Sequence, residues 1–165
     1  MPTRIGRLSQ TPTNTGLPAG LANPIRPQRF AGRHTSPLAA SLGLTQFGVN
    51  HRVLDPGAYS SLRHWHEQED EFVYVLSGDL VLIDESGEHA LAPGDYVAFL
   101  AGEANAHHLA NRSASPASYL EVGTRKVGRE TVHYPDDLAE PQHVDRDERG
   151  QRLAAAPGVI PRSAK

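Results

Sequence analysis

The chain has 165 residues, a formal net charge of -3 and no cysteine. This length suits one domain with its own core and excludes two domains of ordinary size, and the lack of cysteine excludes disulfides and thiolate metal ligands. Because no stretch is apolar and long enough to cross a membrane, and the N-terminus lacks the apolar centre of a secretory signal, we expect a cytoplasmic protein without a membrane partner.

Residues 1–40 are basic and rich in proline, and we interpret them as an extended or partly disordered arm. Before Asp55 the chain carries six arginines and no acidic residue, whereas the rest carries 10 basic and 19 acidic side chains, a balance of -9. Because opposite charges attract, we expect the arm to lie across the folded body or across a neighbouring subunit.

Two other interpretations of the arm are weaker. An organelle transit peptide is also rich in arginine and hydroxyl groups, but the six prolines do not suit the amphipathic helix that such peptides form. Nucleic-acid binding is not expected, because the arginines are dispersed, the whole chain is slightly acidic and no stacking aromatic residues accompany the arginines.

Eight short segments after the arm have the alternating pattern, or the β-branched and aromatic composition, of strands. They cover residues 45–54, 59–65, 71–76, 80–84, 89–91, 96–100, 107–111 and 117–124. Turn residues separate them at short spacing, such as Gly78 and Asp79, and no long helical period intervenes. The pattern therefore predicts an all-β fold, an antiparallel barrel or sandwich.

The segment from Gly57 to Gly78 holds the clearest candidates for metal binding. His64 and His66 are two positions apart, so in an extended chain both imidazoles project to the same side. Glu71 begins the next predicted strand, and folding that strand back beside the histidines would supply an anionic oxygen ligand. A fourth ligand is expected from further along the chain.

The order and spacing of these residues resemble the two sequence motifs of the cupin family. The first motif is Gly, five or six residues, His-x-His, three or four residues, Glu, six residues, Gly, and the segment from Gly57 to Gly78 fits it throughout. The fixed positions of the second motif are occupied by Gly94, Gly102, His107 and Asn111. Two departures lengthen the turn before the last ligand: Leu100 stands where proline is usual, and four residues instead of two precede the histidine.

The resemblance covers residues 42–125 and implies a small single-domain cupin. It implies a cupin-type β-barrel, a double-stranded β-helix or jelly roll, at 41–127. The composition of residues 128–165 predicts a partly disordered C-terminal extension. The resemblance also implies a site for one divalent ion, manganese, iron, nickel or zinc, whose ligands are His64, His66, Glu71 and His107. The open alternatives are His108 in place of His107 and, through a slip of one residue, Asp70 in place of Glu71.

Side chains around such a site are predicted from strand alternation. Apolar residues expected to face inward are Leu62, Val73, Val75 and Leu109, a lining that suits a small organic ligand with an oxygen donor. Polar and aromatic candidates whose direction depends on the strand register are Gln46, Asn50, Arg52, Tyr59 and Phe99. Asn111 is expected to hold a turn, and Trp65 to point away from the metal.

Such a metal site leaves coordination positions for water or substrate, so the ion can act as a Lewis acid or bind dioxygen. We expect a metal-dependent enzyme acting on a small polar organic molecule, dioxygenase-like or sugar-isomerase-like. The alternative is a non-catalytic sensor barrel that binds a small molecule or a metal; zinc hydration is weaker, because Glu71 and the motif spacings count against it. Since barrels of this kind often pair, we also expect a homodimer.

Overall fold

The computed structural model describes residues 3–17, 27–137, 141–148 and 153. Its strands are β1 (Asn14–Thr15), β2 (Arg33–Pro37), β3 (Phe47–Leu54), β4 (Trp65–His66), β5 (Glu71–Ser77), β6 (Leu80–Asp84), β7 (Gly87–Leu91), β8 (Tyr96–Phe99), β9 (His108–Ala110), β10 (Ala117–Thr124), β11 (Gly128–His133) and β12 (Gln142–Arg146). The helical elements are η1 (Leu8–Gln10), η2 (Pro27–Phe30) and α1 (Leu38–Ser41). None of the helices in these segments is long and apolar enough to cross a membrane.

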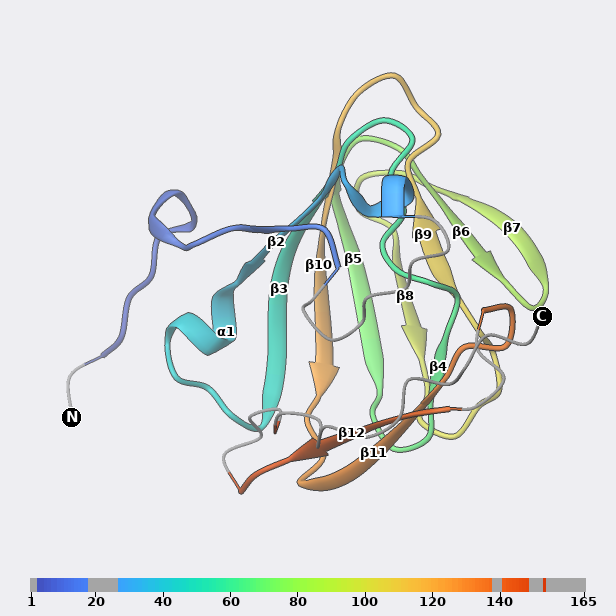
Figure 1. The fold of residues 1–165 in the computed structure, drawn as a ribbon. Helices are drawn as coiled ribbons and strands as arrows, with labels where there is room; N and C mark the ends of the chain where they lie inside the picture. The colour runs from blue at the N-terminus through green and yellow to red at the C-terminus, as the bar shows by residue number, and fades with distance from the viewer. Residues whose placement is uncertain (1–2, 18–26, 138–140, 149–152, 154–165) are drawn as a thin grey trace.

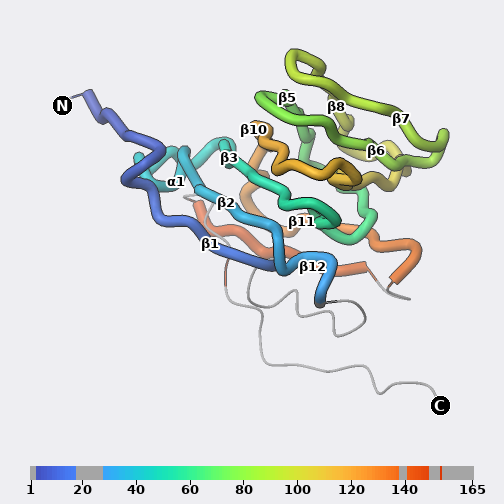
Figure 2. Tube along the Cα trace, turned by 90° about the horizontal axis from the view of Figure 1, so that it is seen from above, coloured from blue at the N-terminus to red at the C-terminus, as the bar shows by residue number. Residues whose placement is uncertain are grey.

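The strands form three sheets (Figures 1 and 2). The largest has the order β1-β2-β3-β10-β5-β8, and the two smaller sheets have the orders β7-β6-β9 and β12-β11-β4. All strand pairs in the described residues are antiparallel. The predicted all-β antiparallel fold is therefore confirmed.

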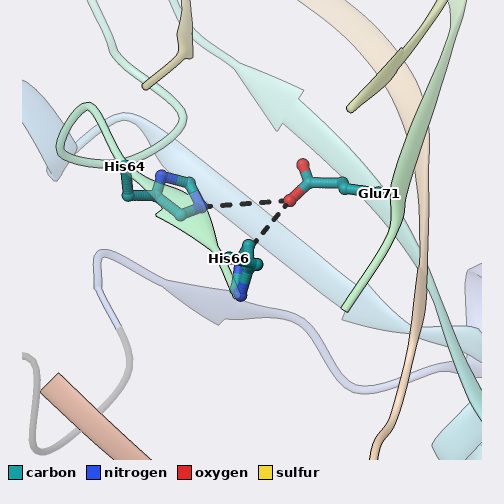
Figure 3. A group of neighbouring side chains, drawn as sticks. All are labelled: His64, His66 and Glu71. Atoms are coloured by element: carbon teal, nitrogen blue, oxygen red, sulfur yellow. Dashed lines mark ion pairs between the residues drawn. The ribbon is translucent and has the colours of Figure 1, made fainter. Parts of the chain in front are cut away.

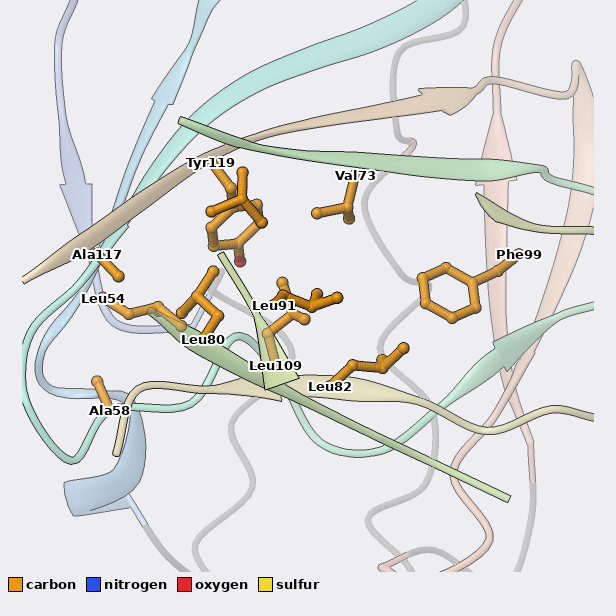
Figure 4. Packing of buried hydrophobic residues seen from close by; sticks show 11 residues of the cluster. Leu54, Ala58, Val73, Leu80, Leu82, Leu91, Phe99, Leu109, Ala117 and Tyr119 are labelled. Atoms are coloured by element: carbon orange, nitrogen blue, oxygen red, sulfur yellow. The ribbon is translucent and has the colours of Figure 1, made fainter. Parts of the chain in front are cut away.

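The main core lies between the six-stranded sheet and the β7-β6-β9 sheet (Figure 4). On β5 the side chains of Val73 and Val75 are buried, whereas Phe72 and Tyr74 are exposed on the outer face. This alternation follows from the two-residue period of a strand, and each fully buried apolar side chain stabilises the fold by about 1.5–3 kcal/mol. Packing of the apolar side chains between the two sheets therefore stabilises the barrel.

The segment at 59–65 differs from the strand that the sequence predicts. Only Trp65 and His66 pair as a strand, while Tyr59 and His64 form isolated bridges to Ala110 and His107. The other seven predicted strands are present, with ends shifted by no more than two residues. The irregular stretch is the one place in the predicted barrel where alternation alone does not describe the backbone.

Both flanking segments contribute strands that the sequence analysis did not predict. β2, inside the predicted arm, pairs along β3, and in the C-terminal extension β11 pairs with both β12 and β4. Val132, Tyr134 and Val144 form a small second core with Leu62 packed against it. The division of the chain at residues 41 and 127 stays a prediction, and 149–152 and 154–165 of the predicted extension lie outside the described residues.

Gly78 carries the chain from one sheet to the other. β5 pairs with β8 and β10 while β6 pairs with β7 and β9, so the predicted turn joins two layers and not two partners of a hairpin. Gly78 has a φ of +71°, and a Cβ at this position would lie 2.8 Å from the Cα of Ala117 and 2.8 Å from the carbonyl oxygen of Pro116. Both the backbone angle and the close approach require glycine.

We predict that Gly78→Ala lowers the free energy of unfolding. Backbone strain contributes about 1–3 kcal/mol, and the steric overlap with Pro116 and Ala117 adds to this loss. Gly94→Ala is the matched control, because Gly94 also has a positive φ of +96° but has no atom within 4 Å of the added Cβ. Denaturant unfolding of both variants measures the difference. Equal destabilisation by the two substitutions would contradict the close-approach argument.

Candidate metal centre

Three imidazoles converge on one carboxylate oxygen inside the barrel, and Figure 3 shows two of them, His64 and His66, with Glu71. The Oε2 atom of Glu71 lies 3.9 Å from Nε2 of His64, 3.8 Å from Nε2 of His66 and 3.8 Å from Nε2 of His107. One ligand atom each from His64, His66 and Glu71 all lie within 4.8 Å of one another. These separations are too long for hydrogen bonds between the groups and leave room for an ion among them.

Backbone pairing positions the histidines. His64 and His107 exchange two backbone hydrogen bonds, with N–O distances of 3.2 Å and 2.9 Å, so their side chains are carried by directly opposed residues. His66 lies on β4, two positions after His64, and Glu71 is the first residue of β5. The i, i+2 spacing predicted from the sequence is therefore present in space, although the strand itself begins only at Trp65.

The Nδ1 atoms of His64 and His107, which lie on the ring side away from Glu71, donate hydrogen bonds to backbone carbonyls. His64 Nδ1 donates to the carbonyl oxygen of Leu62 over 2.9 Å, and His107 Nδ1 donates to that of Asn105 over 3.0 Å. A proton on Nδ1 leaves the Nε2 lone pair of the neutral ring directed at Glu71, as a metal ligand requires. His107 Nε2 is buried without a hydrogen-bond partner, which is the condition expected of a nitrogen whose partner is an ion.

The protonation states fit the same arrangement. Burial lowers the pKa of His64 to about 3, more than the charge of Glu71 raises it. Burial alone would raise the pKa of the Glu71 carboxyl, but its interactions with His107, His64 and His66 outweigh burial and hold that pKa at about 2. At neutral pH the site therefore presents a neutral His64 imidazole and an ionised carboxylate, the forms that bind a divalent cation.

Glu130 lies behind His66 and was missed by the sequence analysis. Its side chain is fully buried on β11, and Oε1 accepts a hydrogen bond from the Gln68 amide over 3.2 Å and lies 3.4 Å from Nδ1 of His66. The latter contact is not aligned as a hydrogen bond. Burial alone would lower the pKa of His66, but Glu130 together with the charges of Glu71 and Glu69 outweighs burial and raises that pKa. A carboxylate behind a ligating histidine orients the ring and increases its basicity.

A cavity of about 260 Å³ opens beside these four residues. The strand register determines which residues form its inner wall. On β10, Gly123 lies opposite Glu71 of β5, and Glu121, two positions before Gly123, lies opposite both Val73 of β5 and Asn50 of β3. The next inward row is formed by Tyr119, Arg52 and Val75. The wall therefore carries the polar and charged side chains of Asn50, Arg52 and Glu121 close to the candidate ligands.

Glu121 and Arg52 form an ion pair on this wall. Oε1 of Glu121 accepts hydrogen bonds from Nη2 of Arg52 over 2.5 Å and from Nδ2 of Asn50 over 3.0 Å. Burial alone would lower the pKa of Arg52, but Glu121 and the neighbouring oxygens outweigh it and raise that pKa above its ordinary value. Arg52 is therefore a permanent cation whose role is to hold the carboxylate in place.

The alternative ligands lie elsewhere. His108 directs Nδ1 to the carbonyl oxygen of Ser61 and packs its ring against Tyr59, so Nε2 of His107, not of His108, approaches Glu71. Asp70 is exposed and accepts a hydrogen bond from the backbone amide of Ala101. The assignment of His64, His66, Glu71 and His107 as ligands stays a prediction that this geometry supports.

The predicted surroundings are partly reproduced. The predicted cavity-lining residues found around the cavity are Asn50, Arg52, Val73, Phe99 and Leu109. Val75 is in the core and Leu62 packs in the second cluster, while Tyr59 lines a separate cavity with His108. Asn111 is buried and donates to the carbonyl oxygens of Leu54 and Ser115, as expected of a structural residue, and Trp65 stacks on His133, ring against ring at 4.0 Å.

Comparisons with known proteins identify similar sequences and structures. A family model described as the cupin domain matches residues 50–123. A sugar phosphate isomerase of the cupin superfamily from Silicibacter pomeroyi DSS-3 is 39% identical, with a TM-score of 0.74, over 90% of this chain and 96% of that one. A candidate sugar phosphate isomerase from Acidithiobacillus ferrooxidans is 29% identical, with a TM-score of 0.62, over 79% and 81% of the two chains.

A predicted oxalate decarboxylase from Thermotoga maritima shares the fold alone, at 20% identity and a TM-score of 0.58 over 73% of this chain and 98% of that one. No protein of curated function matches the chain at a significant level.

We predict that Glu130→Gln weakens binding of Zn²⁺ or Mn²⁺ by roughly 10- to 100-fold, because it removes the charge that faces His66. Competition with a chromophoric chelator measures the affinity. Glu88→Gln is the control, since Glu88 is also paired, with Arg112, but is exposed on β7. An unchanged affinity in Glu130→Gln would show that Glu130 does not support the metal ligand.

Proposed function

The chain belongs to the cupin superfamily, and we propose that it is a metal-dependent isomerase acting on a sugar phosphate or a chemically similar small polar molecule. The single observation that carries the metal part is the approach of three Nε2 atoms to one Glu71 oxygen at 3.8–3.9 Å. The substrate part is supported by the two similar chains named as sugar phosphate isomerases.

The proposed ligands are His64, His66, Glu71 and His107, around one divalent ion. A set of three imidazoles and one carboxylate suits manganese, iron, nickel or zinc, and gives no site for a metal that prefers sulfur. When bound, such an ion supplies a Lewis acid that polarises a carbonyl or hydroxyl oxygen of the substrate. The buried and unpartnered Nε2 of His107 supports the fit, because a buried polar atom without a partner is otherwise costly.

The residues of the chain itself would bind and orient the substrate. Phe99 stacks parallel to the His107 ring, with ring centroids 3.3 Å apart, and together with Leu109 gives the cavity an apolar side that excludes water. Asn50 and Arg52 supply polar groups to the same cavity. A cavity with both apolar and polar lining suits a small polyhydroxylated molecule.

Isomerisation is preferred here over oxygenation because the two similar chains at 39% and 29% identity, which match over most of this chain, are named as sugar phosphate isomerases. The non-catalytic binding barrel stays the alternative, since a shared fold hosts both enzymes and binding proteins. The predicted homodimer is supported by the outward row of Phe72, Tyr74 and Leu76 on β5, with Tyr96 beside it on β8, all of them exposed. A cytoplasmic location is part of the same proposal.

We predict that the protein purified without chelators holds about one divalent ion per chain, and that Glu71→Ala and His107→Ala each lose it. Plasma mass spectrometry measures the content. The control is His89→Ala, because His89 is exposed and its neighbours are Asp84 and Ser86. Full metal content in both ligand variants would refute the site.

We predict that the metal-loaded protein interconverts an aldose phosphate and its ketose, and that chelation abolishes the activity, because the reaction needs its carbonyl oxygen polarised. Ribose 5-phosphate, glucose 6-phosphate and mannose 6-phosphate, followed by proton NMR, form the first panel. Stoichiometric metal with no conversion of these or related aldose phosphates would favour the non-catalytic binding barrel.

A further inference from the structure

Glu121 presents a free carboxylate oxygen to the cavity. Its Oε1 atom is held by Arg52 and Asn50, whereas Oε2 has no hydrogen-bond partner among the residues that the structure describes. The side chain keeps 18% of its surface exposed and lines the cavity. One oxygen is therefore fixed in position while the other is available to a molecule in the cavity.

The position of Glu121 places this oxygen within reach of a metal-bound substrate. Gly123 is the residue directly opposite Glu71, so Glu121 is its diagonal neighbour on the same inward face. Diagonal neighbours across an antiparallel pair are about 7–8 Å apart at their backbones. Val73, the residue opposite Glu121, lines the same cavity as the two carboxylates. A small molecule beside Glu71 therefore lies next to Glu121 as well.

Other carboxylates near the cavity are already engaged. Both oxygens of Glu69 are bound by Arg146, over 2.7 Å and 3.0 Å. Glu130 faces His66 from behind, and Asp70 is exposed at the barrel rim. Among the described residues that line the cavity, Glu121 is thus the carboxylate that is both fixed and unoccupied on its inward side.

We propose that Glu121 is the residue that moves the carbon-bound proton in the isomerisation, with Asn50 and Arg52 as positioning residues; this rests on the isomerase function proposed above. In the aldose-to-ketose direction the free oxygen of Glu121 takes the proton from carbon 2. The electron pair of that C–H bond forms the double bond between carbons 1 and 2, and the π pair of the carbon 1 carbonyl moves to oxygen 1. Glu121 then returns the proton to carbon 1. The hydroxyl proton of oxygen 2 passes to oxygen 1, and the carbonyl forms at carbon 2.

The test compares the parent with Glu121→Gln in metal-loaded protein. The amide oxygen of glutamine can still accept from Arg52 and Asn50, so the fold and the metal content should be kept, but the amide cannot take a proton. We expect kcat to fall about 10²- to 10⁴-fold with little change in KM, and exchange of the carbon 2 proton with deuterium oxide, followed by NMR, to fall in parallel. Glu121→Asp, which retains a carboxylate, should keep more activity than Glu121→Gln.

The control is Glu88→Gln, which makes the same chemical change at an exposed glutamate that is also paired with an arginine, and should retain parental activity. A parent active on the aldose phosphates, with Glu121→Gln equally active at full metal content, would overturn the role of Glu121 while leaving the isomerase function in place. A metal-loaded parent that converts none of them would overturn the isomerase function, and the role of Glu121 with it. If Glu121→Gln loses its metal or its fold, the Glu121→Asp variant takes its place in the test. A Glu121→Asp variant that is folded and metal-loaded, but is no more active than the misfolded Glu121→Gln, would also refute the proposal.

Discussion

The partly buried carboxylate of Glu71 is the constraint around which the barrel interior is organised. A buried charge is tolerated only where neighbouring groups compensate it, yet the nearest nitrogens lie 3.8–3.9 Å away, beyond hydrogen-bonding distance. Three imidazoles face it with their Nε2 atoms, and two of them are locked in this orientation by backbone carbonyls. A divalent cation at the centre satisfies the carboxylate and the imidazoles at once.

The C-terminal extension completes this interior and is not an accessory to it. β11 pairs with β4 and so brings Glu130 behind His66. β12 carries Arg146 to the buried Glu69 at the mouth of the cavity. The barrel strands position the candidate ligands, and the extension supplies the groups that orient and neutralise their surroundings, so metal binding and docking of the extension should stabilise each other.

The parts of the site that were predictable from the sequence are those set by local geometry. The two-residue period of an extended chain predicts that the side chains of His64 and His66 point to the same side. The resemblance to the cupin motifs predicts that Glu71 and His107 join them as ligands. Glu130 was not predictable, because its position depends on pairing between β11 and β4, which are far apart in the sequence. The position of Glu121 in the cavity likewise depends on the register of β10 against β3 and β5. The irregular backbone at 59–65 depends on bridges to residues far away in the sequence.

The central claim is that one ion is held by His64, His66, Glu71 and His107. The most direct measurement is a crystal structure of the protein purified without chelators, with diffraction data on both sides of the absorption edge of the metal found in the sample. We expect one anomalous peak per chain, about 2.0–2.3 Å from the three Nε2 atoms and from a Glu71 oxygen. A metal ion bound elsewhere in the protein would contradict the account, as would a metal-free site in which Glu71 lies within hydrogen-bonding distance of the imidazoles.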